Sequence, residues 1–151
     1  MKEIPEDNKY FHYYNANPKG KHTKDCTYRA LSLFLDKSWD ELAMLDADVY
    51  LKYGLWLYTT EYSHKESRFK SCLEDFLKEF SVKKYYFEPI DNIKELLLKK
   101  GSIKGFIDEC ADLSKIYLIS TGGHMTVIKN KKVWDIFDCT DLGIAEVFVL
   151  E

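Results

Sequence analysis

The strongest constraint on the fold is a change in residue periodicity about two thirds of the way along the 151-residue chain. Before this change, apolar residues recur at three- and four-residue intervals, which predicts amphipathic helices. After it, β-rich segments alternate with turn-forming dipeptides, which predicts an antiparallel meander. The segments are 116–120, 124–129, 133–137 and 145–150, and the dipeptides are Gly122-Gly123, Asn130-Lys131 and Leu142-Gly143. We therefore expect an α+β fold in which an N-terminal helical half packs on one face of a C-terminal antiparallel β-sheet.

Start and stop signals divide the first two thirds of the chain into separate elements. A helix is expected from about residue 26 to residue 35, with Thr23 or Asp25 as its N-cap. The next helix begins at Ser38, because Ser38 and Glu41 have the spacing of a capping box. The other expected elements are an aromatic strand or arm at 10–14, helices at 67–80, 92–100 and 103–112, and a strand at 82–87, whereas 50–62 has no clear period.

Length and charge limit the classes of protein to which the chain can belong. We expect a single domain over residues 1–151, because two separate cores would each lie near the lower size limit for stable folding. The 22 basic and 25 acidic residues give a net charge of −3, so no excess of cations is available for a phosphate backbone. The N-terminal decapeptide lacks the apolar run of a signal peptide, and no stretch approaches the length that spans a bilayer. The expectation is a cytoplasmic protein with free thiols that binds neither nucleic acid nor membrane.

The four cysteines are too widely spaced for a zinc knuckle or a thioredoxin-like motif. Cys72 and Cys110 have apolar neighbours, which favours a place in the core, and the role of Cys139 beside Asp138 is left open. Cys26 differs, because it lies in the first turn of a predicted helix, where the helix dipole and the terminal amides favour a thiolate anion. The backbone N–H of Cys26 is also the leading candidate to stabilise an oxyanion.

His124 is the candidate base for this thiol, because it follows two glycines and opens a predicted strand. A two-residue turn at 130–131 places His124 opposite Phe137, with Asp135 next along the same face of the hairpin. A turn longer by one residue would place Asp138 opposite His124 instead. Asp135 is therefore the preferred group to orient the imidazole, and Asp138 is the alternative.

Four short stretches resemble the short papain-fold cysteine hydrolases of bacteria and their phages: DCTYRAL at 25–31, SWDEL at 38–42, GHMTV at 123–127 and VWD at 133–135. The resemblance implies a papain-like, or transglutaminase-like, fold for nearly the whole chain. It also implies a triad whose members are Cys26 as nucleophile, His124 as general base and Asp135 as orienting acid. Papain has an oxyanion-hole Gln six residues before its Cys. Here that position is Gly20, so the further oxyanion candidates are Asn15, Asn17 and His22.

These features together predict a small thiol hydrolase of the cysteine peptidase or amidase type. It would act on an amide, peptide or isopeptide bond through an acyl-enzyme on Cys26, with His124 exchanging the proton and Asp135 stabilising the imidazolium. No metal and no organic cofactor is required. The expected partner is a protein or peptide substrate, or a small amide. A phage-encoded protein of this kind would meet a host protein in the host cytoplasm.

Other interpretations of the same residues stay open. Taken singly, Cys26 is interpreted as a small core residue and His124 as a structural histidine. A metal site would join His22 and Cys26, four residues apart, to His124 or Cys139. A catalytically inactive papain-fold protein would instead bind or inhibit a partner protein through its aromatic side chains, which gather at 10–14 and 50–62.

Overall fold

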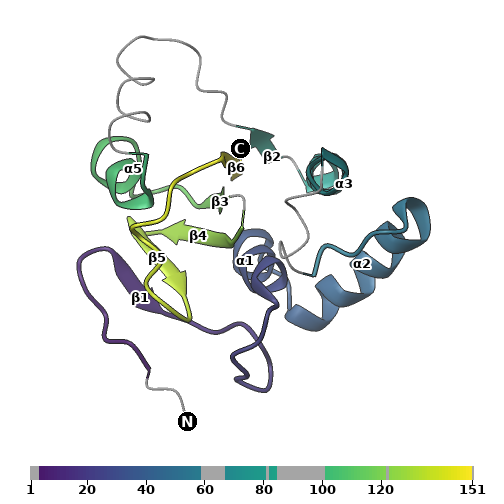
Figure 1. Ribbon diagram of the computed structural model, residues 1–151, viewed down its shortest axis with the longest axis horizontal. Helices are drawn as coiled ribbons and strands as arrows, with labels where there is room; N and C mark the ends of the chain where they lie inside the picture. Colours follow the sequence, from purple (N-terminus) through teal and green to yellow (C-terminus); the bar gives the residue numbers. More distant parts are fainter. Residues whose placement is uncertain (1–3, 59–66, 81, 85–100, 122, 151) are drawn as a thin grey trace.

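The computed structural model describes residues 4–58, 67–80, 82–84, 101–121 and 123–150. Within these ranges, helices flank a sheet of six strands in the order β1-β5-β4-β3-β6-β2 (Figure 1), and the predicted α+β class is confirmed. The helices are α1 (Cys26–Leu35), α2 (Trp39–Tyr53), α3 (Ser67–Leu77), which is followed by the 3-10 turn η2 (Lys78–Phe80), and α5 (Ile103–Glu109). The strands are β1 (Phe11–Tyr13), β2 (Val82–Lys84), β3 (Tyr117–Ser120), β4 (Met125–Lys129), β5 (Lys132–Asp135) and β6 (Glu146–Leu150).

The sheet is mixed, so the prediction of a purely antiparallel meander is wrong in two respects. β1 runs parallel to β5, with Phe11 opposite Val133. β6 pairs with β3 and not with β5, the strand that precedes it in the chain. The N-terminal arm supplies the reason, because β1 occupies the outer edge of β5. The connection 136–145 instead crosses to the far side of β3, and the backbone N–H of Lys104 holds it by donating to the Thr140 carbonyl at 2.9 Å.

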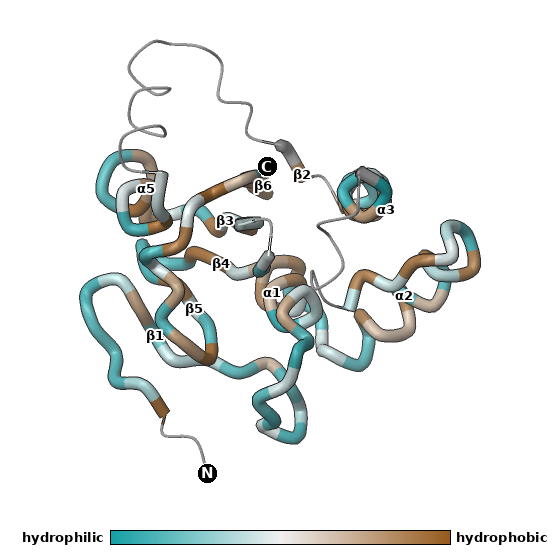
Figure 2. The backbone as a smooth tube through the Cα atoms, in the orientation of Figure 1, coloured by the Kyte–Doolittle hydropathy of each residue, from teal (hydrophilic) through white to brown (hydrophobic). Residues whose placement is uncertain are grey.

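Both faces of the sheet are covered, whereas the sequence led us to expect helices on one face. Leu118 on β3 packs in a core shared with α1, α2 and α3, whereas its neighbour Ile119 packs in a second core with Phe106 of α5. Figure 1 shows α5 on the opposite side of the sheet from α1. The cause lies in the sequence, because β3, β4 and β6 are nearly continuous apolar runs that suit a sheet buried on both sides. In Figure 2 these strands are mostly coloured as hydrophobic, whereas the loop that leads into α1 is mostly coloured as hydrophilic.

Capping signals in the sequence locate the starts of both α1 and α2, but of these two helices only α2 has a side-chain cap. The capping box of α2 is confirmed, because Ser38 Oγ accepts from the Glu41 N–H at 3.0 Å and the Ser38 N–H donates to the Glu41 carboxylate at 3.2 Å. The α2 helix ends at Gly54, whose φ of 69° is the left-handed conformation that glycine favours. Asp25, one of the two predicted N-cap residues, holds the N-cap position of α1, but its side chain makes no capping hydrogen bond. The carboxylate of Asp25 instead accepts hydrogen bonds from the side chains of Arg29, Trp39 and Asn17.

The remaining predicted elements are found within three residues of their expected limits where the structure describes them. The predicted helix at 67–80 is confirmed as α3 and η2, and the predicted helix at 103–112 is found as the shorter α5. The aromatic arm forms β1, and the aperiodic stretch after residue 50 begins as the last turn of α2. The strand expected at 82–87 is found over 82–84. The expected helix at 92–100 and residues 85–87 lie outside the described residues.

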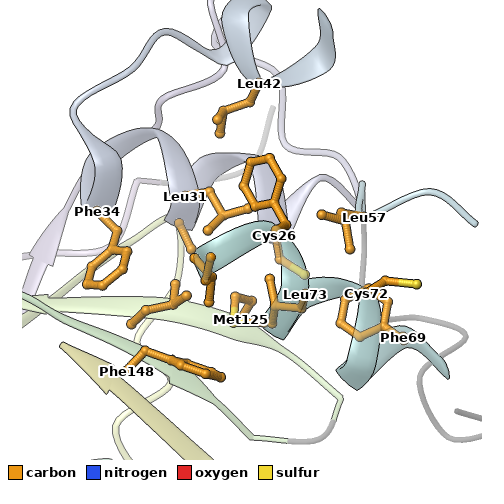
Figure 3. Packing of buried hydrophobic residues seen from close by; sticks show 14 of the residues in the cluster. Cys26, Leu31, Phe34, Leu42, Leu57, Phe69, Cys72, Leu73, Met125 and Phe148 are labelled. Carbon is orange, nitrogen blue, oxygen red and sulfur yellow. The ribbon is translucent and has the colours of Figure 1, made fainter. Parts of the chain in front are cut away.

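Cys26 begins α1 inside the core between the helices and the sheet (Figure 3). Its side chain belongs to one apolar cluster with Leu31, Leu57 and Leu73. Cys72 lies in the same cluster and is only 2% exposed, which confirms its predicted place in the core. In the described part of the chain, we find no helix with the length and apolar character needed to cross a membrane. Cys26 also begins a helix and contacts the imidazole of His124.

Candidate active site

The candidate nucleophile is the first residue of α1, so its position matches the expected one. No side-chain oxygen of the N-cap residue covers the amides at this helix end, because Asp25 makes no capping bond. The positive end of the helix dipole therefore acts on the Cys26 thiol without a neutralising cap. Cys26 is buried, with 6% of its surface exposed.

The predicted register of the β4–β5 hairpin is confirmed. Lys129 lies opposite Lys132, and both residues of the intervening turn have positive φ, 53° and 58°, as in a type I′ turn. In this register His124, just before β4, reaches Asp135 at the end of β5, and its Nε2–H donates to Asp135 Oδ2 at 2.7 Å. The His124 ring also packs on Phe137, with ring centroids 4.8 Å apart. The hairpin thus holds the imidazole on two sides.

The imidazole of His124 also meets two thiols, those of Cys26 and Cys139. Burial by itself lowers the pKa of His124, but hydrogen bonds with Asp135, Cys139 and Cys26 outweigh it and raise that pKa well above the usual value for histidine. His124 consequently holds its proton at neutral pH. A protonated imidazole beside a thiol at a helix start is the environment that favours a thiolate.

Asp135 is buried, 4% exposed, and its two carboxylate oxygens have different partners. Oδ1 accepts from the backbone N–H of Ile136 at 2.7 Å and lies 3.7 Å from the guanidinium of Arg29. Oδ2 accepts from His124 and, at 3.7 Å, from the thiol of Cys139. Four groups therefore fix the carboxylate that orients the histidine. Arg29 was not predicted as a member of the site, and Cys139 was considered only as a ligand of the alternative metal site.

Asp138, the alternative third member, faces away from His124. Its Oδ2 accepts from the side-chain amide of Asn8 at 3.0 Å, and its Oδ1 accepts from the backbone N–H of Thr140 at 3.1 Å. Burial raises the pKa of Asp138, but the hydrogen bonds from Thr140 and Asn8 outweigh it and leave the pKa below its usual value. Asp138 therefore fastens the N-terminal arm to the connection after β5.

The side chains considered for the oxyanion hole all have structural partners. The amide of Asn17 donates to Asp25 Oδ2 at 3.0 Å, and that of Asn15 donates to the Lys21 carbonyl at 3.0 Å. His22 Nε2 is hydrogen-bonded to the hydroxyl of Tyr13 at 2.8 Å. These bonds shape the loop before α1. The backbone N–H of Cys26 is accordingly the donor that we retain for the oxyanion.

The other thiols differ from Cys26 in their surroundings. Cys110 is half-buried, and burial with the nearby Glu109 raises its pKa. Cys139 is buried, and burial also raises its pKa, although the contact with His124 opposes this shift. Among these thiols, Cys26 is the one that combines a helix start with a contact to His124.

A group of metal-ligating side chains overlaps the site. His124, Asp135 and Cys139 offer ligand atoms that all lie within 4.8 Å of one another. The metal site considered from the sequence required His22, which is bound to Tyr13 and does not belong to this group. The guanidinium of Arg29 lies 3.7 Å from Asp135, and its charge opposes a cation at this place. The same side chains therefore suit proton transfer better than metal binding.

Of the residues singled out in the sequence, Cys26 and Asp135 thus both contact the imidazole of His124. Comparisons of the chain with protein-family models, with curated proteins and with solved structures gave no match. The function is therefore inferred from the geometry of this site.

Proposed function

We propose that this protein is a small thiol hydrolase with a papain-like fold, of the cysteine peptidase or amidase type. The observation that carries the proposal is that one partly buried imidazole, that of His124, contacts the Cys26 thiol and is bound at 2.7 Å to the carboxylate of Asp135. The order of the three residues supports it: Cys at a helix start, His at a strand start and Asp on the next strand. A nucleophile, a base and a group that orients the base are the parts that acyl transfer requires.

In the proposed reaction the resting site holds a Cys26 thiolate and a His124 imidazolium. The thiolate attacks the carbonyl carbon of an amide, forming a carbon–sulfur bond and a tetrahedral oxyanion. The carbon–nitrogen bond then breaks as Nδ1 of His124, the ring nitrogen not bound to Asp135, gives its proton to the departing amine. Water adds next to the thioester, and neutral His124 accepts its proton. The carbon–sulfur bond breaks, which releases the acid and restores the thiolate.

The chain supplies a donor for the oxyanion and a support for the charge on the histidine. The backbone N–H of Cys26, at the positive end of α1, donates to the developing oxyanion. Asp135 holds the ring through Nε2 throughout the cycle and offsets its positive charge in the steps in which the ring is protonated. No organic cofactor enters any of these steps.

The substrate class follows from the chemistry of the acyl-enzyme. A protein or peptide bond, an isopeptide bond or a small amide would each give the same thioester, and transfer to an amine in place of water would give transamidation. The setting that goes with this proposal is the cytoplasm, with a host protein as target if the chain is encoded by a phage.

Alkylation by iodoacetamide near neutral pH tests the proposal through the thiolate. Cys26 should react at least about tenfold faster than Cys110, although Cys110 is the more exposed thiol. The His124→Ala variant should slow the reaction of Cys26 by a similar factor, because the imidazolium that stabilises the thiolate is lost. Mass spectrometry of the alkylated peptides assigns each rate to its cysteine.

Cys110 serves as the matched control, because its rate should be the same in the wild-type protein and in His124→Ala. Labelling that follows exposure alone, with Cys110 ahead of Cys26, would contradict the thiolate and with it the proposed hydrolase.

A catalytically inactive papain-fold binding protein is the second candidate function. The outer side of α2 favours it, because Met44 and Leu51 are 76% and 82% exposed and Tyr50 stacks on the exposed Trp56. Such a surface suits a partner protein. Sluggish alkylation of Cys26 in the experiment above would favour this candidate over the hydrolase.

A further inference from the structure

Arg29 lies one helical turn after Cys26 and is almost completely buried. Its Nη1 donates to Asp25 Oδ1 at 2.9 Å, and its Nη2 lies 3.7 Å from Asp135 Oδ1. Asp25 immediately precedes the nucleophile, and Asp135 orients the histidine. A single guanidinium therefore links the two halves of the proposed catalytic apparatus.

Asp25 is fully buried and is bound on both oxygens. While Oδ1 accepts from Arg29, Oδ2 accepts from the indole N–H of Trp39 at 2.7 Å and from the side-chain amide of Asn17 at 3.0 Å. An aspartate at this position would ordinarily cap the helix, which requires its carboxylate to turn toward the helix amides. Here those three contacts draw it to the side, away from the helix start.

We propose that Arg29 is a positioning residue of the site, which aligns Cys26 with the His124–Asp135 pair by holding Asp25 and Asp135 on one guanidinium. This inference rests on the proposed thiol chemistry and extends it to a residue that the sequence did not indicate. The guanidinium is planar and carries several donors in a fixed geometry, so it can hold two carboxylates at a defined separation. One carboxylate lies at the start of α1 and the other on β5, two elements that the chain brings together only on folding.

The charge of Arg29 matters as well as its shape. Among the described residues, the charged groups that face it are Asp25 from the start of α1 and Asp135 from β5, and the Thr23 carbonyl lies at 3.4 Å. With His124 protonated and Cys26 ionised, negative and positive groups alternate from Asp25 through to the thiolate. Without the guanidinium, buried Asp25 would lose its ion pair and Asp135 would be balanced by His124 alone, which adds net negative charge near an anion. Arg29 therefore also favours the reactive form of Cys26.

Two substitutions in the Arg29–Asp25 ion pair test this role, because one removes a positive charge and the other removes a negative charge. The measurement is the rate of Cys26 alkylation by iodoacetamide as a function of pH, and its readout is the pH at half-maximal rate. Arg29→Met removes a cation and should raise this midpoint by about one pH unit, whereas Asp25→Asn removes an anion and should lower it. The double variant should return close to the wild-type midpoint, and Arg29→Lys, which keeps the charge but not the fork, should lie between wild type and Arg29→Met.

A merely structural role for Arg29 would lower the melting temperature without moving the midpoints in opposite directions, and that result would overturn the proposal. If Arg29→Met does not fold, Asp25→Asn and Arg29→Lys decide it on the same criterion. Wild-type Cys26 that shows no enhanced reactivity would remove the proposed function and this inference together. Enhanced reactivity in the wild-type protein with unmoved midpoints would remove only the role of Arg29.

Discussion

Two buried networks of hydrogen bonds begin at neighbouring residues of α1, Tyr28 and Arg29, and they differ in the charge of their members. The charged network runs from Asp25 through Arg29 and Asp135 to His124. The neutral-donor network is centred on Asp46 of α2, which accepts from the hydroxyl of Tyr28 and from the backbone N–H of Leu57. Both contain a buried aspartate, yet only one leads to a thiol.

The partners of each aspartate explain the difference. Asp46 has no ion pair among the described residues, and burial raises its pKa although the hydrogen bonds from Tyr28 and Leu57 oppose the rise. Asp135 faces a guanidinium on one oxygen and a protonated imidazole on the other. A carboxylate held by neutral donors fastens chain segments to each other. A carboxylate held between two cations can support the movement of a proton at its far partner.

The largest expected effect lies in the neutral-donor network. Asp46→Ala should lower the free energy of unfolding by about 3 kcal/mol, because it leaves the Tyr28 hydroxyl and the Leu57 N–H buried without their acceptor. The midpoint of Cys26 alkylation with pH should stay at its wild-type value. Chemical denaturation and the alkylation profile measure the two quantities, and a shifted midpoint would show that the networks are coupled.

His124 should give the charged network a pH-dependent contribution to stability. Its folded pKa is raised above the ordinary value of 6.5, so the protonated ring stabilises the folded state fully below pH 6.5, and this contribution decreases as the pH rises toward the folded pKa. The difference in unfolding free energy between wild type and His124→Gln should be about 2 kcal/mol at pH 6 and smaller at pH 9. Denaturation of both proteins at several pH values measures it. A difference that grows with pH would contradict the protonated ring.

Trp39 should give the smallest effect, although it touches both networks. Its indole N–H donates to Asp25, and its ring packs edge-on against Tyr28. Trp39→Phe keeps an aromatic ring but loses the hydrogen bond, so it should lower the free energy of unfolding by about 1 kcal/mol. It should also shift the midpoint of Cys26 alkylation slightly upward, because Asp25 loses a donor that stabilises its charge and directs its carboxylate away from Cys26. Trp134→Phe, which loses a bond to the Lys129 carbonyl instead, is the matched control and should leave the midpoint unchanged.

Features that depend on neighbouring residues were predictable from the sequence. The capping box of Ser38 and Glu41 needs only its own three-residue spacing. The hairpin register follows from a two-residue turn, and it decides between Asp135 and Asp138 as the partner of His124. In each case the local spacing leaves few alternatives.

Features that depend on contacts far apart in the chain were not predictable in the same way. β1 pairs with β5 because the arm finds an open strand edge, and no period in the sequence records that choice. Asp25 was expected to cap α1, but Arg29, Trp39 and Asn17 together offer it more donors than the helix end does. The one sign of Arg29's role was a single cation in the most apolar part of a predicted helix, since such a residue needs buried anionic partners.

The order in which the parts of the site leave the ribosome has a consequence for when the chemistry can begin. Cys26 is made early, whereas β4 and β5, which carry its partners, are made last among the pieces of the site. Domains generally fold as units during synthesis, and this site exists only once α1 has packed against the β4–β5 hairpin. A nascent chain therefore carries an unactivated thiol. If the proposed thiol chemistry holds, the reactive thiolate arises only after folding, and an incomplete chain on the ribosome has no reactive thiolate at this position.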